Sequence, residues 1–166
     1  GNSWVETPVW NQLASESLLW EHCLSDSTQL ASAYRSYWQG IHALGHAANR
    51  DYPSIVRRIG ACGVHTALVT DAPDVRLHPL AADFATVVEC PIPDRRQPCR
   101  SPDECHFARL VDRVAETLES LPRPCLVWAH SCGMQGPWDA PLDLRTRFRE
   151  EGDPEPYDGT TPPVQR

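Results

Sequence analysis

The stretch Gly63-Val64-His65-Thr66-Ala67-Leu68-Val69-Thr70-Asp71 decides the fold class of this chain. Its residues 66–70 form a short apolar run bounded by polar residues, which is typical of a strand buried on both faces. Runs of the same kind at 84–88 and 125–129 predict two further strands. Because segments with helical periodicity separate these runs, we expect the three strands to lie in one largely parallel sheet.

Three segments show the apolar spacing of helices that pack on such a sheet. They are residues 7–18, 52–60 and 103–120, and we expect them to cover both faces of the sheet. A short helix is predicted at 142–148, and the Pro-rich tail at 150–166 is predicted to be extended. The sequence therefore predicts an α/β fold, a largely parallel sheet with helices on both faces.

Composition excludes several classes of function. The 166 residues fit one domain, and 22 acidic against 15 basic residues give a net charge of −7, which disfavours a nucleic-acid partner. Every basic residue is Arg, so Schiff-base chemistry and a P-loop lysine are excluded. No apolar run is long enough for a membrane span, and the first residues lack the pattern of a signal peptide.

Several cysteines and histidines are candidate metal ligands. His42 and His46 are four residues apart but lack the flanking pattern of a zinc helix, and this favours a surface pair. Cys99, Cys105 and His106 share one loop, but their gaps match no common zinc spacing, so zinc stays the lesser alternative there. Free thiols in a reducing compartment are expected, and this favours the cytoplasm. The seven cysteines are at positions 23, 62, 90, 99, 105, 125 and 132.

Three segments resemble motifs of one enzyme family, in the family's order. Residues 7–16, Thr-Pro-Val-Trp-Asn-Gln-Leu-Ala-Ser-Glu, resemble T-P-N-x-D-x-L-A-x-E-G. Residues 55–71 resemble the family's helix and following strand, L-x-x-x-G-Y-x-T-A-L-V-T-D, and residues 126–141 resemble F-L-W-V-H-x-x-x-P-H-G-P-Y-D-P-P. The chain is thus similar to sulfatases, of the alkaline-phosphatase-like superfamily. The resemblance implies that residues 1–149 form part of the family's α/β sandwich, and that 150–166 lead toward the rest of it.

Sulfatases hydrolyse sulfate esters with a formylglycine made from Cys or Ser in C/S-x-P-x-R, with calcium bound by carboxylates and a His that protonates the leaving group. By this resemblance the nucleophile position is Ala31, four residues before Arg35, and the position of the acid is Gln135. A methyl group cannot become formylglycine, and an amide cannot protonate an alkoxide at neutral pH. Ser32, one position away, is an alternative nucleophile only if the alignment slips. Calcium is expected only for an intact family member, and no cofactor is expected in this segment.

Three matched positions retain residues suited to catalysis, Arg35, Asp71 and His130. Each also has a structural interpretation: a helix-anchoring Arg, a turn cap before Pro73, and a histidine satisfied within the fold. The leading hypothesis is a sulfatase-like domain with a degenerate, inactive site. The alternatives are an active sulfatase or phosphodiesterase that takes site residues from outside this segment, and a binding or scaffold module. The expected partner is a sulfated small molecule or a glycan.

Overall fold

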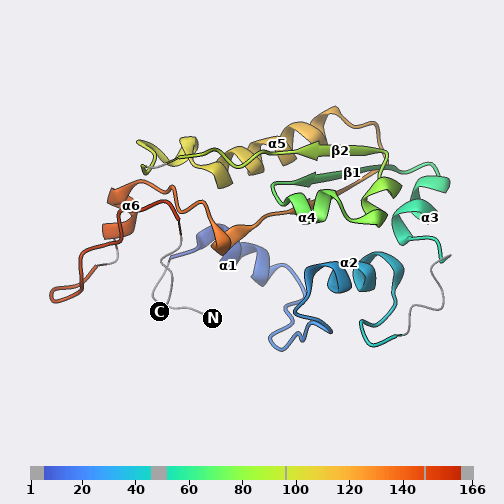
Figure 1. Cartoon of the computed structure of the whole chain (residues 1–166), viewed down its shortest axis with the longest axis horizontal. Coiled ribbons are helices and arrows are strands. Elements are labelled where there is room, and N and C mark those ends of the chain that lie inside the picture. Colours follow the sequence, from blue (N-terminus) through green and yellow to red (C-terminus); the bar gives the residue numbers. More distant parts are fainter. Residues whose placement is uncertain (1–5, 46–51, 96, 148, 162–166) are drawn as a thin grey trace.

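A three-stranded parallel sheet forms the centre of the computed structural model, which describes residues 6–45, 52–95, 97–147 and 149–161. Strand β1 (His65–Thr70) lies between β2 (Thr86–Glu89) and β3 (Cys125–His130) (Figure 1). Both pairings are parallel, with Leu68 opposite Val87 on one side and Trp128 on the other. The predicted α/β class and the single parallel sheet are confirmed.

Helices lie on both faces of this sheet. Helix α5 (His106–Ser120) covers one face, and α2 (Leu30–Gln39), α3 (Ile55–Ala61) and α4 (Pro73–Arg76) gather on the other (Figure 1). Helices α1 (Pro8–Ser15) and α6 (Leu142–Thr146) lie beyond the carboxyl ends of the strands or beside them. Short 3₁₀ helices occupy Pro79–Asp83, Pro102–Glu104 and Gly133–Gln135.

The core is divided by the sheet, because successive side chains of a strand point to opposite faces. On the face of α2, Leu68 packs with Tyr34, Trp38, Val56 and Phe84. On the face of α5, Val69 packs with residues that include Leu110 and Val127. Residues 66–70 are all buried, which confirms β1 as a strand covered on both faces.

Helix α1 departs from the prediction for 7–18. It ends at Ser15, none of its residues is buried, and the side chains of Val9 and Trp10 are 76% and 68% exposed. Leu18 and Leu19 follow outside the helix and are also exposed. The segment is helical as expected. The prediction that it covers the sheet is wrong, because its apolar side chains do not pack into a core formed by the described residues.

The other boundaries shift for local reasons. Helix α3 begins after Ser54, whose Oγ accepts a hydrogen bond from the backbone N–H of Arg57 at 3.0 Å. The predicted start at residue 52 is therefore wrong. Helix α5 begins at His106 rather than 103, because the 3₁₀ helix precedes it. The short helix predicted at 142–148 is present as α6, which ends earlier, at Thr146, and residue 148 lies outside the described residues. Helices α2 and α4 were not predicted.

The described part of the tail, 149–161, contains neither helix nor strand and folds back on the chain. Thr160 is buried; its carbonyl accepts from the N–H of Trp138 at 2.7 Å, and its hydroxyl donates to the carbonyl of Arg95 at 2.5 Å. Arg145 donates to the carbonyls of Tyr157 and Gly159. Within the described residues, no helix is long and apolar enough to cross a membrane.

Candidate functional site

A recess of about 490 Å³ opens where the chain leaves the carboxyl ends of β1 and β3. In parallel sheets the carboxyl ends of neighbouring strands meet at one edge, and this edge is where α/β folds place ligands. Helix α2 forms the opposite wall. The residues that line the recess include Leu30, Ala33, Asp74, His130, Ser131 and Gln135.

At the sheet edge, behind Ser131 and Cys132, Asp71 is the centre of a buried polar network. Its side chain is 1% exposed and follows β1 directly. One carboxylate oxygen accepts from Nε2 of His106 at 3.0 Å and from the hydroxyl of Ser131 at 3.2 Å. The other accepts from the backbone N–H of Cys132 at 2.7 Å. Three donors thus satisfy a charge that would otherwise be costly to bury.

His130, the last residue of β3, is held by helix α2. The phenolic hydroxyl of Tyr34 shares a hydrogen bond with Nδ1 of His130, and the two rings meet edge to face at 5.3 Å. Burial lowers the pKa of His130, while the charge of Asp71 partly opposes that shift. Burial also raises the pKa of the Tyr34 hydroxyl. The imidazole is therefore neutral near pH 7, and Tyr34 fixes its orientation.

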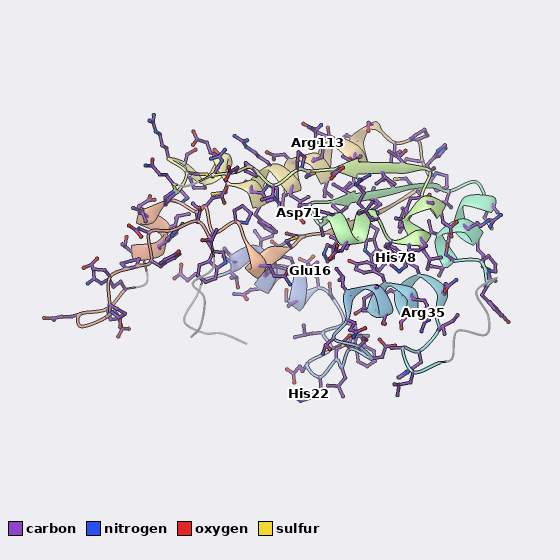
Figure 2. All side chains as sticks on the ribbon, viewed as in Figure 1. Glu16, His22, Arg35, Asp71, His78 and Arg113 are labelled. Atoms are coloured by element: carbon purple, nitrogen blue, oxygen red, sulfur yellow. The ribbon has the colours of Figure 1, made fainter. Side chains whose placement is uncertain are left out.

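The positions singled out in the sequence divide into two groups. Leu30 and Ala33 of α2 line the recess together with His130 and Gln135, and Asp71 lies behind it. The nucleophile position, Ala31, is exposed and is not among the described lining residues. Arg35 lies apart from Asp71 (Figure 2). Its guanidinium donates to the carbonyls of Ala43 and Gly45, both at 3.4 Å. The structure therefore brings together Asp71 and His130, and gives Arg35 a structural contact.

The network has the composition of a Ser-His-Asp triad but not its connectivity. In a working triad the histidine takes the proton of the serine, while the carboxylate orients the histidine. Here Ser131 and His106 both donate to Asp71, and the second described bond of the Ser131 hydroxyl is from the N–H of Gly133 at 2.9 Å. This arrangement holds the carboxylate in place and does not activate a nucleophile.

The electrostatics of the recess disfavour an anion. The ionisable groups described along its wall are Asp74, the neutral His130 and the thiol of Cys132. Burial, followed by the charge of Asp71, raises the pKa of the Cys132 thiol to about 11, so it is protonated at neutral pH. The described lining residues include no positively charged side chain that could bind a sulfate or phosphate in the recess.

Calcium does not fit these residues either. Calcium takes six to eight oxygen ligands, usually with several carboxylates. Both carboxylate oxygens of Asp71 already accept hydrogen bonds from fixed donors. Asp74 lies in the first turn of α4 and is exposed. Within the described part of the chain, this edge does not offer the oxygen set that the ion needs.

Sequence reasoning missed the partners of Asp71. The sequence groups His106 only with Cys99 and Cys105, whereas in the structure the His106 ring is hydrogen-bonded to Asp71. The polar run that follows β3 was a usable signal, since Ser131 and Cys132 stand at the same sheet edge as Asp71. Asp139 takes the place beside Cys99 and Cys105 that the sequence had suggested for His106.

Comparison with known proteins gives no relative. No protein-family model, no curated protein and no solved structure matches the chain.

Proposed function

We propose that this chain is a sulfatase-like domain that does not hydrolyse sulfate esters. The observation that carries the proposal is the composition of the recess at the carboxyl edge of the sheet. Residues flanking Ala31, together with His130 and Gln135, come from two separate segments of the resemblance and line the same recess. Such a meeting of two segments is what the resemblance expects of a family site, and it supports the resemblance, while the exposed Ala31 itself lies outside the described lining.

The chemistry of the lining supports the absence of turnover. Transfer of a sulfuryl group needs preorganised positive charge around its oxygens, and loss of one such contact costs about 10²–10³ in rate. The described wall offers Asp74 and neutral groups instead. Loss of a general acid costs about a further 10²–10⁴, although such losses need not multiply. Gln135 cannot protonate a leaving alkoxide.

A second candidate is a binding module for a neutral polyhydroxyl ligand such as a glycan. It is favoured by the hydroxyl and amide groups of Ser27, Thr28 and Gln135, which line the recess without a neighbouring cation. Such groups exchange hydrogen bonds with sugar hydroxyls in either direction. This candidate shares the recess with the first and differs from it in predicting saturable glycan binding.

The test rebuilds the nucleophile motif. Ala31→Cys, alone and with Ala33→Pro, is expressed with the formylglycine-generating enzyme, and sulfate release from nitrophenyl sulfate is measured with and without calcium. The backbone N–H of Ala33 donates to the carbonyl of Gln29 at 3.0 Å, so proline there removes a helix hydrogen bond. Folding of each variant is therefore checked by circular dichroism. Ala61→Cys, at the exposed end of α3, is the matched control.

We expect background rates from the parent chain and from every folded variant. Sulfate release by the parent would establish the alternative of an active hydrolase. Calcium-dependent release by the rebuilt variant, absent from the Ala61→Cys control, would show that the site is intact except for one residue, and would overturn the proposal. If the double variant unfolds, sulfate release by the parent or by the single variant would still overturn the proposal.

A further inference from the structure

A second cluster of chemically active side chains lies near the start of α5, apart from the recess. The thiols of Cys99 and Cys105 and a carboxylate oxygen of Asp139 all lie within 4.8 Å of one another. Cys99 and Asp139 are 6% and 3% exposed, and Cys105 is partly buried. Two thiols and a carboxylate that converge inside a protein are a set of potential metal ligands. Here the thiols come from residues 99–105 and the carboxylate from residue 139.

The backbone around the cluster holds these ligands in place. The N–H of Cys99 donates to the carbonyl of Asp139 at 2.8 Å, which joins the two segments directly. The carboxylate of Asp139 accepts from the N–H of His106, the first residue of α5, at 2.9 Å. Cys105 immediately precedes that residue. The helix start therefore fixes Cys105 and Asp139 relative to each other, and outer hydrogen bonds of this kind orient ligands in metal sites.

The spacing of the three ligand atoms is compatible with a zinc ion. Zinc binds thiolates at about 2.3 Å and carboxylate oxygens at about 2.0–2.2 Å, so ligand atoms on it lie roughly 3.6–3.8 Å apart. The three atoms observed within 4.8 Å would need to approach one another by at most about 1 Å. Hard ions such as calcium and magnesium are disfavoured because they take oxygen ligands and not thiolates.

Charge balance also favours a divalent ion. The guanidinium of Arg95 lies 2.7 Å from the sulfur of Cys99. Two thiolates and one carboxylate carry three negative charges, and a divalent ion together with Arg95 neutralises them. A buried charge is tolerated when it is paired or bound to a metal. Without the ion, burial followed by the charge of Asp139 raises the pKa of Cys99 to about 11, and the same causes raise that of Cys105.

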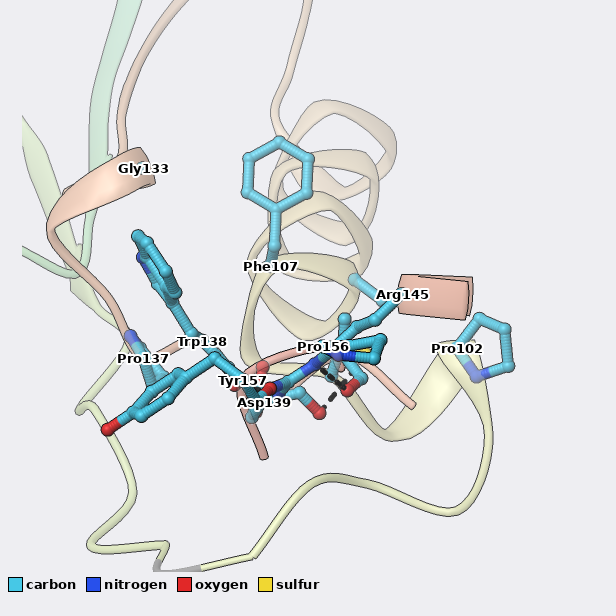
Figure 3. A pocket seen from close by; sticks show the side chains of 12 residues that line it. Pro102, Phe107, Gly133, Pro137, Trp138, Asp139, Arg145, Pro156 and Tyr157 are labelled. Carbon is cyan, nitrogen blue, oxygen red and sulfur yellow. Dashed lines mark hydrogen bonds between the residues drawn. The ribbon is translucent and has the colours of Figure 1, made fainter. Parts of the chain in front are cut away.

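The cluster is accessible from a cavity. Cys105 and Asp139 line a cavity of about 610 Å³, whose walls include Phe107, Trp138 and Tyr157. Figure 3 shows Asp139 close to Trp138 and Tyr157 at this cavity, with Phe107 of α5 above them in the view. An ion bound by the cluster would therefore have both an entry path and an open side, where a water or a small ligand completes four-coordination.

We propose that Cys99, Cys105 and Asp139 form a zinc site with one position open toward this cavity. The site is independent of the recess and of the proposed absence of sulfatase activity. Two thiols lose their protons when the ion binds, so two protons are released for each zinc ion and affinity increases with pH.

The test uses the whole reduced chain, freed of metal with a chelator. Zinc is titrated in competition with a chromophoric chelator, and cobalt is titrated while the absorption of thiolate-to-cobalt charge transfer is recorded. We expect one tight ion per chain and a thiolate-cobalt band. Replacing an outer partner of a metal ligand typically costs 10–100-fold in affinity, so Cys99→Ser, Cys105→Ser and Asp139→Asn should each weaken zinc binding at least about tenfold.

Other thiols supply the controls. Cys125→Ser removes a partly exposed thiol outside the cluster, and Cys23→Ser with Cys62→Ser removes two exposed ones. These variants should bind zinc as the parent does. Zinc affinity unchanged in the Cys99→Ser/Cys105→Ser double variant, or lost only with Cys23 and Cys62, would overturn the proposal. If the cluster variants unfold, cobalt binding by the parent without a thiolate band would overturn it on its own.

Discussion

Replacing Asp71 with asparagine tests the buried network with almost no change in shape. The asparagine oxygen can still accept from the N–H of Cys132, which lies 2.7 Å from the carboxylate of Asp71. The new NH₂ group, however, faces the other two donors, the ring of His106 and the hydroxyl of Ser131. The hydroxyl can turn and accept a hydrogen bond, whereas the buried ring nitrogen loses its charged partner.

The size of the effect follows from these contacts. A hydrogen bond to a charged group contributes about 1.5–3 kcal/mol, and a buried donor left without its partner costs about 1–3 kcal/mol. Because Asp71→Asn retains one bond and weakens another, we expect the free energy of unfolding to fall by about 2–4 kcal/mol. In a chain of this length each kcal/mol lowers Tm by about 2–4 °C, so Tm should fall by roughly 4–16 °C.

Urea unfolding followed by tryptophan fluorescence measures this change, with an unchanged m-value as the sign of two-state behaviour. Asp74→Asn is the matched control, because Asp74 is exposed in the first turn of α4 and its interaction with the helix dipole contributes about 0.3–1 kcal/mol. An Asp71→Asn variant within about 0.5 kcal/mol of the parent, the range of ordinary surface changes, would refute the interpretation of Asp71 as the centre of the network.

Three further perturbations test other parts of the structure. Burial lowers the pKa of His78 and His130 below 6.5. The contribution of these neutral histidines to the free energy of unfolding is therefore full above pH 6.5 and is lost as the pH falls toward their pKa in the folded state. The urea midpoint of the parent should fall on acidification, and it should fall less in the His78→Gln and His130→Gln variants. Trp38→Ala should cost about 3–5 kcal/mol in urea unfolding. Trp38→Phe should cost less than about 1.5 kcal/mol, because it removes a buried indole N–H that has no partner among the described residues; equal losses would contradict this. Arg145→Met should speed limited proteolysis of 149–161 more than Arg145→Lys, since the guanidinium donates to carbonyls of the tail, and equal rates would contradict that role.

The strands were predictable because their signal is local. A run of five apolar or small residues between polar ones located β1 to within one residue. The prediction for β2 began two residues early, at Phe84, which is buried in the core but precedes the first paired residue, Thr86. A buried residue outside a strand and a buried residue within one give the same apolar signal in the sequence. Only the hydrogen bonding to the neighbouring strand distinguishes them.

Helix α2 shows where local signals end. Its buried side chains are Ala33, Tyr34 and Trp38, and the remaining positions are polar, small or exposed. The aromatic pair is buried because Phe84 and Trp128, from other elements, lie against it. The opposite error occurred at α1, whose apolar spacing was clear but whose side chains are exposed. Periodicity predicts which face is apolar, and tertiary contacts decide whether that face is buried.

The candidate site was predictable only at its strand ends. Asp71 follows β1 and His130 ends β3, and residues at the carboxyl ends of parallel strands meet at one edge. The donors to Asp71 are 35 residues away, at His106, and 60 away, at Ser131. No spacing rule connects such distant residues, because the fold and not the local backbone sets their separation.

His106 explains why the two carboxylates at this edge have different chemistry. Its ring donates to Asp71 at 3.0 Å, while its backbone N–H donates to Asp139 at 2.9 Å. Asp71 receives two further donors and is fully satisfied, so it has little to offer a cation. Asp139 lies beside two thiols that donate little, since S–H is a weak donor. The capacity to bind a metal is therefore at Asp139, although Asp71 is the carboxylate that the sequence made conspicuous.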